Sequence, residues 1–342
     1  MRVGIAYDLK SDYIAEGYTD EEAAEFDSEE TIAGIENALK ANGFKTNRIG
    51  NVRSLLSLLH NGKRWDIVFN ICEGMYGIGR EAQVPAILDV YKIPYTFSDV
   101  LVNSLTLHKG LTKRVIRDMG IPTADFVVVE SEKDINNIDL PFPLFAKPVA
   151  EGTGKGINPN SKINKFSELK KVCLDILSQY KQAVLVETFL PGREFTVGIV
   201  GTGEESEAIG IMEVCFRENE NLPEGSQESK IYSYNSKANY QELVDYVLPE
   251  QEVINECYEI ALSSWKGLGC RDGGRIDLRM DKNGIPNFIE VNPLAGLNPV
   301  HSDLPILSRI AGVSYNELIG KIMKSALIRT KFNEKQQGRN LI

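Results

Sequence analysis

The stretch GGRIDLRMDKNGIPNFIEVNPLAGLNP, residues 273–299, predicts two short strands joined by a tight turn. Polar residues fall on odd positions along residues 275–280, with apolar residues between them, and on even positions along 288–292, a period of two that is typical of β-strands. Between the two runs lies Asn283-Gly284, the strongest short signal for a hairpin, because both residues of a two-residue turn must accept positive φ. The sequence therefore predicts a β-ribbon with one polar face.

The register of this ribbon predicts a metal site. If 283–284 is a two-residue loop, Asp277 faces Glu290 and Arg275 faces Asn292 on one side of the ribbon. Opposed residues lie about 5 Å apart at Cβ, where like charges are destabilising and a cation between them removes the penalty. Oxygen ligands without nearby Cys or His favour Mg²⁺, which proteins bind with one or two carboxylates plus substrate phosphates. A four-residue loop would keep the same face, whereas an odd-length loop would not.

A solvated hairpin edge with scattered charges is the alternative interpretation of the same pattern. The residues that follow, Asn292-Pro293 and the small side chains up to Gly296, put flexible backbone N–H groups beside the acidic pair. They favour a site over a plain edge.

Length and composition indicate a globular protein of two or three packed units, because 342 residues can bury that many cores. Apolar and charged contents of 42% and 25% are ordinary for such a protein. The net charge of -10 argues against nucleic acid or an anionic membrane as the main partner. No apolar run approaches the length of a membrane span, and the start MRVGIAY is expected to be a strand, not a signal peptide.

The five cysteines are scattered, odd in number and without CxxC spacing, which favours a cytoplasmic location with reduced thiols. The three histidines lie far apart in the sequence and indicate no zinc site.

Strand and helix patterns alternate along residues 1–97, which predicts an open, mostly parallel sheet. Asp27 and Glu30 form a plausible capping box for its first helix. Ligands in such sheets bind beyond the carboxyl ends of the strands. The loop 71–82, rich in glycine and charge, leaves such an end. The expected strands are 1–8, 44–49, 65–70 and 94–97, and two further helices span 52–60 and 83–91.

Ser104 is expected to cap a helix that carries Lys109 and Lys113, one turn apart on the same face. Such a pair usually faces solvent. Further along, three glycines within residues 152–156 let the backbone fold closely over a ligand, and successive N–H groups there can bind an anion. The pattern matches neither a Walker A loop nor a dinucleotide fingerprint. The expected strands of this region are 126–130, 143–148, 184–187 and 194–200, with a helix at 166–179.

The long polar stretch 216–241 is expected to be a loop with a function, since long loops in compact domains usually have one. Helices are expected at 252–268, 304–311 and 315–328, and the polar tail 331–342 is expected to fray.

Taken in order, the Lys147-Pro148 and glycine loop, the strand Glu194-Phe195-Thr196-Val197 and the hairpin resemble the ATP-grasp superfamily, and more closely the D-alanine–D-alanine ligases. The resemblance runs from residue 1 to about 328. Its other specific motifs are Pro94-Tyr95-Thr96, Lys109 with Lys113, Gly274-Arg275-Ile276-Asp277 and Glu290-Val291-Asn292-Pro293.

The resemblance implies an α/β fold of the ATP-grasp type, in which an N-terminal open parallel-sheet domain is followed by two ATP-grasp subdomains that clamp the nucleotide. The implied boundaries are 1–103 for the N-terminal domain, 104–190 for the central subdomain, 191–330 for the C-terminal subdomain with the hairpin, and 331–342 for the tail.

The resemblance also implies three groups of site residues. ATP would contact Lys109 and Lys147 at its phosphates, the loop residues Glu151, Gly152, Thr153, Gly154 and Gly156 above them, Glu187 and the backbone at Leu190 at the adenine, Glu194 at the ribose, and Lys237 at the phosphates. Two Mg²⁺ or Mn²⁺ ions would be held by Asp277, Glu290 and Asn292. The catalytic group would be Arg275, the backbone amide at Gly296, Glu25 and Ser302. The implied partners are small amino-acid substrates and a second copy of the chain, with no nucleic acid and no membrane.

Several positions depart from the family pattern. The family's glycine loop contains consecutive serines, where this chain has Thr153-Gly154-Lys155. The family's lid tyrosine is absent after Lys237, its His-Gly pair is replaced by Glu73-Gly74, and an extra residue precedes His301-Ser302. Glu25 is the candidate for the family's N-terminal glutamate.

Because the nucleotide and metal positions are kept and the amino-acid pocket has changed, the sequence predicts an ATP-dependent carboxylate–amine ligase whose substrates differ from two D-alanines. Lys155 and Glu73 are hypothesised to lie near the altered pocket and to select a differently charged substrate. Three alternatives stay open: a true D-alanine–D-alanine ligase, an ATP-binding protein without ligase activity, and an enzyme that phosphorylates a small acid without capturing an amine.

Overall fold

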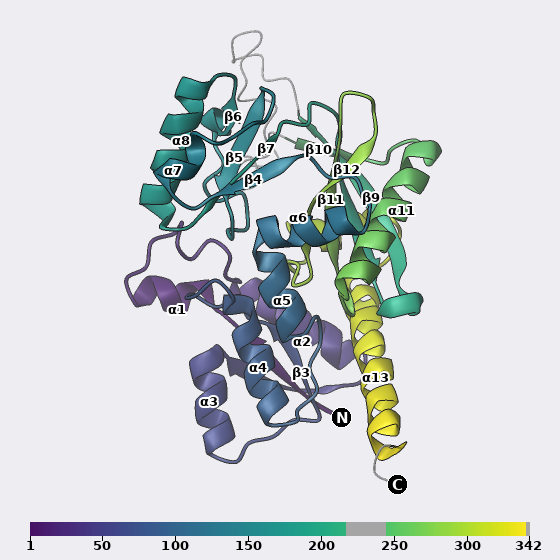
Figure 1. Cartoon of the computed structure of the whole chain (residues 1–342). Coiled ribbons are helices and arrows are strands. Elements are labelled where there is room, and N and C mark those ends of the chain that lie inside the picture. Colours follow the sequence, from purple (N-terminus) through teal and green to yellow (C-terminus); the bar gives the residue numbers. More distant parts are fainter. Residues whose placement is uncertain (217–243, 340–342) are drawn as a thin grey trace.

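The computed structural model describes residues 1–216 and 244–339, and this part of the chain contains three β-sheets surrounded by helices (Figure 1). The predicted loop 216–241 lies outside the described residues except for residue 216. Lys237 is therefore not described either. The three sheets follow one another along the sequence, except that helices α5 and α6 stand between the first and the second.

The N-terminal sheet is parallel, with strand order β2-β1-β3, which confirms the prediction of a parallel sheet. Residues 94–97, expected as a further strand, form only a single bridge from Tyr95 to Val68. The strands are β1 (Arg2–Tyr7), β2 (Lys45–Gly50) and β3 (Ile67–Ile71), and the helices are α1 (Lys10–Ala15), α2 (Glu29–Ala41), α3 (Val52–His60) and α4 (Gln83–Val90).

Two helices, α5 (Val100–Leu107) and α6 (Lys109–Asp118), stand where a single helix was expected. The prediction that Ser104 is the cap is wrong, because Asp99 caps α5 through the Val102 N–H. The chain bends at His108, whose Nδ1 accepts the Leu111 N–H at 3.2 Å and so caps α6. This break makes Lys109 the first residue of α6.

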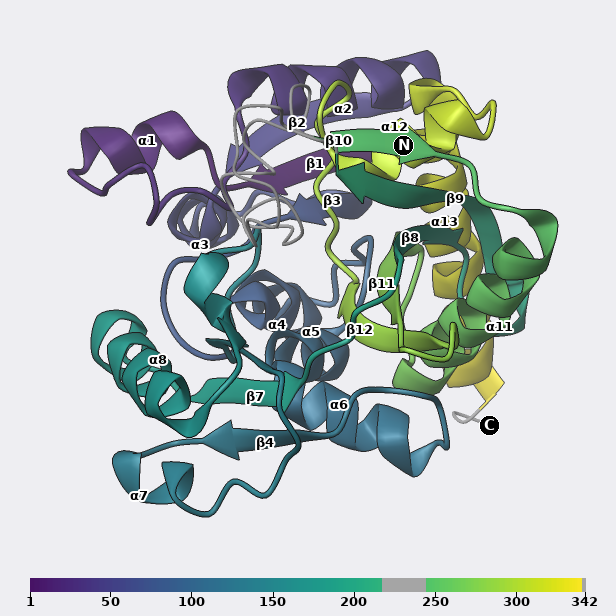
Figure 2. The ribbon, with the colours of Figure 1, turned by 90° about the horizontal axis from the view of Figure 1, so that it is seen from above.

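The second sheet is antiparallel, with order β4-β7-β5-β6, and carries α8 on one face. Figure 2 shows this sheet and α8 on one side of the molecule and the third sheet with α11 on the other. Its elements are β4 (Phe126–Val129), α7 (Glu132–Ile135), β5 (Leu144–Pro148), β6 (Lys162–Ile163), α8 (Phe166–Tyr180) and β7 (Val184–Thr188).

The third sheet has the order β10-β9-β8-β11-β12, with the predicted hairpin at one edge. Helix α11 packs on it through buried residues such as Trp265. Its elements are β8 (Glu194–Val200), β9 (Glu207–Phe216), β10 (Val244–Val247), α11 (Gln251–Leu268), β11 (Gly273–Met280), β12 (Pro286–Asn292), α12 (Asp303–Ile310) and α13 (Tyr315–Arg339).

The hairpin places Asp277 opposite Glu290 as predicted, but through a different turn. Asp281 and Ile285 enclose three residues, the Asp281 N–H donates to the Ile285 carbonyl at 2.9 Å, and only Gly284 takes a positive φ, of 81°. This is a three-residue loop with a left-handed glycine, so the prediction of a two-residue turn at 283–284 is wrong.

A β-bulge restores the predicted register. Near the turn Leu278 pairs with Phe288, and continuing that register would place Asp277 opposite Ile289. The register shifts between Asp277 and Leu278, so that Ile289 is the extra residue of β12. Because a bulge inserts one residue into one strand, it cancels the odd length of the loop and returns Glu290 to the face of Asp277.

A shared hydrophobic core joins the N-terminal sheet to the third sheet. Ile32 and Ile35 of α2 lie in one buried cluster with Leu318 and Ile322 of α13. Helix α13 therefore packs along the N-terminal unit, and Figure 1 shows it running from the third sheet toward that unit. It continues to Arg339 where the sequence predicted an end at 328 and a frayed tail.

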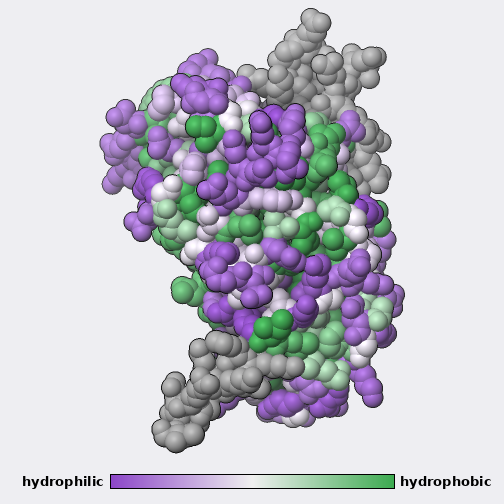
Figure 3. Space-filling view, turned by 90° about the vertical axis from the view of Figure 1, so that its right-hand side faces the viewer, coloured by the Kyte–Doolittle hydropathy of each residue, from purple (hydrophilic) through white to green (hydrophobic). Residues whose placement is uncertain are grey.

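The face of the molecule in Figure 3 mixes hydrophilic and hydrophobic side chains without one continuous apolar band. Within residues 1–216 and 244–339, no helix is long and apolar enough to cross a membrane.

The prediction that Asp27 caps α2 is wrong. Ser28 is the cap, its Oγ accepting the Thr31 N–H at 3.3 Å. Asp27 lies beside Asp8, and its backbone N–H donates to the Asp8 carbonyl at 3.1 Å. Burial raises the pKa of the Asp27 carboxyl to about 7, helped by the negative charge of Asp8 and opposed by a hydrogen bond from Thr31. The folded chain therefore favours neutral Asp27.

We expect Asp27→Asn to stabilise the protein relative to wild type above pH 7 and not below pH 4. Below pH 4 the carboxyl is protonated in both states, whereas between pH 4 and 7 the unfolded chain releases a proton that the folded chain keeps, so wild-type stability falls through that window. Urea denaturation at pH 4, 5.5 and 8 would measure the free energy of unfolding. Glu30→Gln, at an exposed position of the same helix, is the control. A difference between Asp27→Asn and wild type that does not vary with pH would contradict the prediction.

Candidate active site

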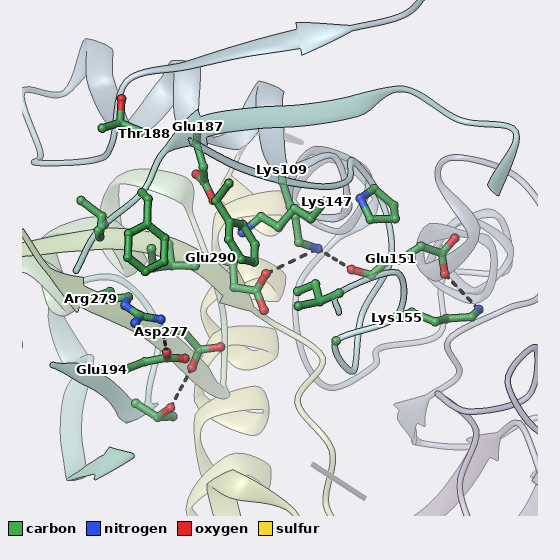
Figure 4. A pocket seen from close by; sticks show the side chains of 18 of the residues that line it. Lys109, Lys147, Glu151, Lys155, Glu187, Thr188, Glu194, Asp277, Arg279 and Glu290 are labelled. Atoms are coloured by element: carbon green, nitrogen blue, oxygen red, sulfur yellow. Dashed lines mark hydrogen bonds and ion pairs between the residues drawn. The ribbon is translucent and has the colours of Figure 1, made fainter. Parts of the chain in front are cut away.

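Two cavities lie side by side where the three sheets meet. The first, here called the inter-sheet cavity, lies between β5 and β7 of the second sheet and β8, β11 and β12 of the third (Figure 4). The second, here called the acidic cavity, lies between the N-terminal unit and the hairpin and is lined by Glu25, Glu73 and Glu81. Lys109, Arg275 and Glu290 line both.

The inter-sheet cavity collects most residues that the resemblance assigned to the nucleotide. They are Lys109, Lys147, Glu151, Gly154, Glu187, Leu190 and Glu194. Gly152 and Thr153 line the acidic cavity, Gly156 lines neither, and Lys237 lies outside the described residues. These residues come from separate strands and one loop, and their convergence on one cavity supports a common binding function.

Among the described residues, three donors at three positions hold Asp277 in place. Thr196 of β8, which is opposite Asp277 in the sheet, donates from Oγ1 to Oδ1 at 3.0 Å. Asn292 donates from Nδ2 to Oδ2 at 3.3 Å, and Arg275 forms an ion pair with the same oxygen. Arg275 also lies 3.6 Å from the carboxylate of Asp303, the first residue of α12. The side chain of Asp277 is therefore nearly immobile.

Glu290 receives its cation from a different element. Lys109, at the start of α6, places Nζ 3.5 Å from Glu290 Oε2 and donates to the Glu151 carbonyl at 2.6 Å (Figure 4). Arg275 and Lys109 thus neutralise the opposed carboxylates, one each. A metal ion was expected to relieve the repulsion between these two carboxylates, and the protein itself provides part of this relief.

The donor set fits a magnesium or manganese ion only together with phosphate oxygens. Among the described residues no group of three or more His, Cys, Asp or Glu side chains could hold a metal by itself. Asp277 and Glu290 supply two carboxylates on one face, and Asn292 supplies an amide. Because Mg²⁺ is usually bound by one or two carboxylates with substrate phosphates, this pair suits a metal that arrives with a nucleotide.

A buried ion network lies behind the inter-sheet cavity. Lys113 Nζ lies 2.5 Å from Glu187 Oε2, and Lys147 Nζ lies 3.1 Å from Glu187 Oε1. All three residues are buried, Lys113 completely, so the expectation of a solvent-facing lysine pair is wrong for Lys113. Burial alone would raise the pKa of Glu187, but the two lysines outweigh it and lower that pKa to about 2. Glu187 is therefore a fixed negative charge.

The glycine loop is tied to the N-terminal unit by Glu25 and Arg80. The Gly152 N–H donates to Glu25 Oε1 at 2.5 Å, and Arg80 bonds to Glu25 Oε2 at 2.7 Å and to the Ala150 carbonyl at 3.0 Å. A Cβ on Gly152 would come within 2.6 Å of Glu25, so a glycine is required for this approach. Sequence had suggested Glu25 but could not have found Arg80, which shows no local pattern.

Lys155 forms an ion pair with Glu151 at 2.9 Å, and it lines the inter-sheet cavity, not the acidic one. Glu73 lines the acidic cavity. The two residues thus line different cavities, and the hypothesis that they select the substrate stays a prediction.

Of the remaining predicted catalytic residues, Gly296 and Ser302, only Gly296 lines a cavity. Gly296 lines the acidic cavity with Arg275. Ser302 lines neither cavity; its Oγ accepts the Asn298 N–H at 3.0 Å, and a Cβ on Gly296 would come within 2.9 Å of it. Ser302 thus supports the loop that carries Gly296, while its assignment as a catalytic residue stays a prediction.

Sequence reasoning missed Arg279, which lines the inter-sheet cavity and pairs with Glu194 at 3.0 Å. Its signal was present, because Arg275, Asp277 and Arg279 alternate along one face of β11. Thr196 lies in a motif that the sequence had marked, and its role became visible only with the pairing of β8 and β11.

Comparison with known proteins gives one consistent family. Residues 115–324 match the family model described as D-ala D-ala ligase C-terminus. A D-alanine–D-alanine ligase from Aquifex aeolicus is 31% identical over 259 residues, covering 75% of this chain and 81% of the relative. An uncharacterised protein, y4sG, from Sinorhizobium fredii is 30% identical over 76% of this chain and 74% of its own length. A D-alanine–D-alanine ligase from Bordetella avium is 28% identical over 90% and 92% of the two chains.

Solved structures of the D-alanine–D-alanine ligase from Bacillus anthracis have the same fold. The one complexed with ATP gives a TM-score of 0.70 and another 0.73, each at 22% identity and covering 97% of this chain and 99% of that one. The predicted fold class, α/β with two ATP-grasp subdomains, is confirmed. The predicted subdomain boundaries stay predictions.

We expect Glu187→Gln to lower the free energy of unfolding more than Lys113→Met. Removing the carboxylate leaves two buried lysines without their shared partner, a loss that typically costs about 3–5 kcal/mol. Lys113→Met leaves Glu187 paired with Lys147, and the double variant should cost less than the sum of the two. Urea denaturation at pH 7 measures all three. Glu168→Gln, which breaks an exposed pair with Lys165 and keeps an oxygen for the Asn164 N–H, is the control. Equal losses for the two single variants would refute the network as described.

Proposed function

The chain belongs to the D-alanine–D-alanine ligase family, and from this premise we propose that it joins the carboxylate of one amino acid to the amine of a second amino acid or related compound, at the expense of ATP. Its class is that of the ATP-grasp ligases, which form a carbon–nitrogen bond. ADP and phosphate are the other products.

The observation that carries this proposal is that Lys109, Arg275 and Glu290 line both cavities. A nucleotide in the inter-sheet cavity would place its terminal phosphate at this junction, and a carboxylate in the acidic cavity would meet it there. Transfer between two ligands requires such a shared point, because reacting atoms must approach within about 3–3.5 Å.

The chemistry explains why charged groups gather at the junction. A carboxylate attacked directly by an amine has no viable leaving group. Transfer of the γ-phosphoryl group to a carboxylate oxygen breaks the bond to ADP and gives an acyl phosphate. The amine then attacks the carbonyl carbon, its proton passes to solvent, and phosphate leaves with the electrons of the carbon–oxygen bond. Catalysis of such a transfer is mainly positioning and neutralisation of charge.

Each cation at the junction has a distinct part in this scheme. Lys109 and Lys147 would hold the phosphates, and Arg275 would stabilise the phosphoryl group in transit and the oxyanion of the tetrahedral intermediate. A backbone N–H at Gly296 would supply the second donor to that oxyanion. One such donor is worth on the order of 3 kcal/mol. The loop 150–157, which Glu25 holds through Gly152, would keep water from the acyl phosphate.

Asp277, Glu290 and Asn292 are the residues that would hold one or two Mg²⁺ or Mn²⁺ ions. Metal bound there would neutralise the phosphate oxygens. At the other end of the same cavity, Glu187 and Leu190 would face the adenine and Glu194 the ribose, as the family resemblance implies.

A true D-alanine–D-alanine ligase is the second candidate, favoured by the names of the relatives that are 28–31% identical. The replaced residues, above all Glu73, favour a different substrate. That the enzyme works as a homodimer in the cytoplasm remains a prediction from the family and the composition.

We expect ATP hydrolysis to depend on amino acids and to yield a dipeptide or amide. A screen of D- and L-amino acid pairs with phosphate release and product mass spectrometry would test this. Phosphate release with no amide product would indicate an acid kinase, and D-alanine as the sole effective substrate would establish the second candidate.

Arg275→Met should lower kcat about a hundredfold to a thousandfold with little change in the KM for ATP, since the guanidinium is proposed to act mainly in the transition state. Arg275→Lys should lose less, because it keeps the charge beside Asp277 and Asp303. Arg53→Met, at an exposed site of α3, is the control. Circular dichroism would check that each variant folds, and a folded Arg275→Met enzyme with wild-type kcat would exclude the assigned role.

A further inference from the structure

The acidic cavity contains more negative charge than the junction chemistry needs. Its lining includes four carboxylates and two cations, so that two negative charges lack a counter-ion on its wall. The carboxylates are Glu25, Glu73, Glu81 and Glu290, and the cations are Lys109 and Arg275. The carboxylates come from three separate parts of the chain, so the excess is a property of the folded cavity.

Both lining cations already have other partners. Lys109 lies 3.5 Å from Glu290 and donates to the Glu151 carbonyl. Arg275 pairs with Asp277 and lies 3.6 Å from Asp303. Neither is therefore available to neutralise a carboxylate on the N-terminal wall of the cavity.

Glu25 is also fully engaged. Its Oε1 accepts the Gly152 N–H and its Oε2 the Arg80 guanidinium, and its side chain is only 9% exposed. Two of the four carboxylates, Glu25 and Glu290, thus have cationic partners. The charge without a partner belongs to the other two.

The side chains of Glu73 and Glu81 accept no hydrogen bond and form no ion pair within residues 1–216 and 244–339. Glu73 follows β3, at the carboxyl end of the parallel sheet where ligands bind in such folds, and Glu81 lies in the turn η1 (Arg80–Ala82). They are close enough that, after burial, the charge of Glu81 is the main cause of the raised pKa of Glu73. Burial raises the pKa of Glu81 to about 7 against the lowering effect of Arg80. Two carboxylates with no internal donor form a strong site for a cation.

We propose that Glu73 and Glu81 bind a positively charged group on the side chain of an amino-acid substrate, and that the enzyme therefore ligates a basic amino acid. The proposal rests on the proposed function, since it names the substrate class of the same site. The carboxylate that is phosphorylated lies toward Arg275 and the phosphates, and the ammonium or guanidinium of the side chain lies toward the N-terminal sheet.

A substrate cation explains the cavity better than a metal ion or a neutral polar group does. The described residues contain no group of three metal-binding side chains, and ionised carboxylates are acceptors only. A hydroxyl could satisfy one acceptor but would leave the charge uncompensated. The α-ammonium that every amino acid carries offsets only one of the two negative charges, whereas a second, side-chain cation offsets the other and supplies further donors.

Binding measured without turnover gives the first test. Isothermal titration at pH 8, with a non-hydrolysable ATP analogue and Mg²⁺ present, would compare ornithine and lysine with their neutral counterparts norvaline and norleucine, in both configurations. We expect the basic amino acid to bind about tenfold to a hundredfold more tightly, the range for hydrogen bonds to charged groups. Equal affinities for a basic amino acid and its neutral counterpart would overturn the proposal.

Variants give the second test. Glu73→Gln and Glu81→Gln should remove most of the preference for the basic amino acid while leaving the affinity for the neutral counterpart and for the ATP analogue unchanged. Glu252→Gln, at an exposed position of α11, is the control. An equal loss of affinity for both kinds of amino acid would assign the two glutamates a structural role and would also overturn the proposal.

Phosphate release with the same amino acids separates this inference from the proposed function. Turnover that does not distinguish basic from neutral amino acids would leave the ligase assignment intact and would refute the proposed preference for basic amino acids. Selective, glutamate-dependent binding of a basic amino acid with no phosphate release in any pairing would support the cation site and refute the ligase.

Discussion

Two carboxylates face each other across a β-ribbon, and the arrangement of the site follows from the need to compensate them. Asp277 and Glu290 are opposed residues of β11 and β12, where like charges repel. The chain brings one cation to each, Arg275 from the same strand and Lys109 from the start of α6. Lys109 can reach Glu290 only because the helix breaks at His108 and α6 begins there. The acidic pair thus determines where the linker helices must lie relative to the third sheet.

The same pair shows what sequence could predict and how. Alternation along 275–280 and 288–292 placed the two acidic residues on one face, and the structure agrees. The predicted turn had the wrong loop length and the prediction missed the bulge, and these two errors cancelled. A Gly in an Asn-Gly pair indicates positive φ without fixing the loop length, and the one local mark of the bulge is the consecutive apolar pair Phe288-Ile289, which interrupts the alternation. The common face of Asp277 and Glu290 was predictable from the alternation of polar residues, not from the turn.

Other differences have a tertiary origin. Most of the longer helices and strands and the parallel first sheet follow local patterns and were predicted within a few residues, whereas α1, α7, β6, β9 and β10 were not predicted. Lys113 looked like a surface residue because its neighbours in sequence are polar, and only the approach of β7 with Glu187 makes its burial tolerable. Arg80 could not have been selected, since its partners Glu25 and Ala150 are distant in sequence. The predicted roles of Ser302 and Lys237 remain predictions.

Cations and carboxylates are equal in number on the wall of the inter-sheet cavity, whereas carboxylates outnumber cations in the acidic cavity, and this difference orients the ligands. Lys147 and Lys155 line the inter-sheet cavity but not the acidic cavity, whereas Glu73 and Glu81 line only the acidic one. A polyanion that reaches the junction from the inter-sheet cavity is repelled by the carboxylates beyond it. A zwitterion with an additional positive charge meets the reverse gradient, so its carboxylate is drawn toward Arg275 and its cation away from it. The field therefore orders carboxylate and phosphate head to head before any contact specific to one substrate is made.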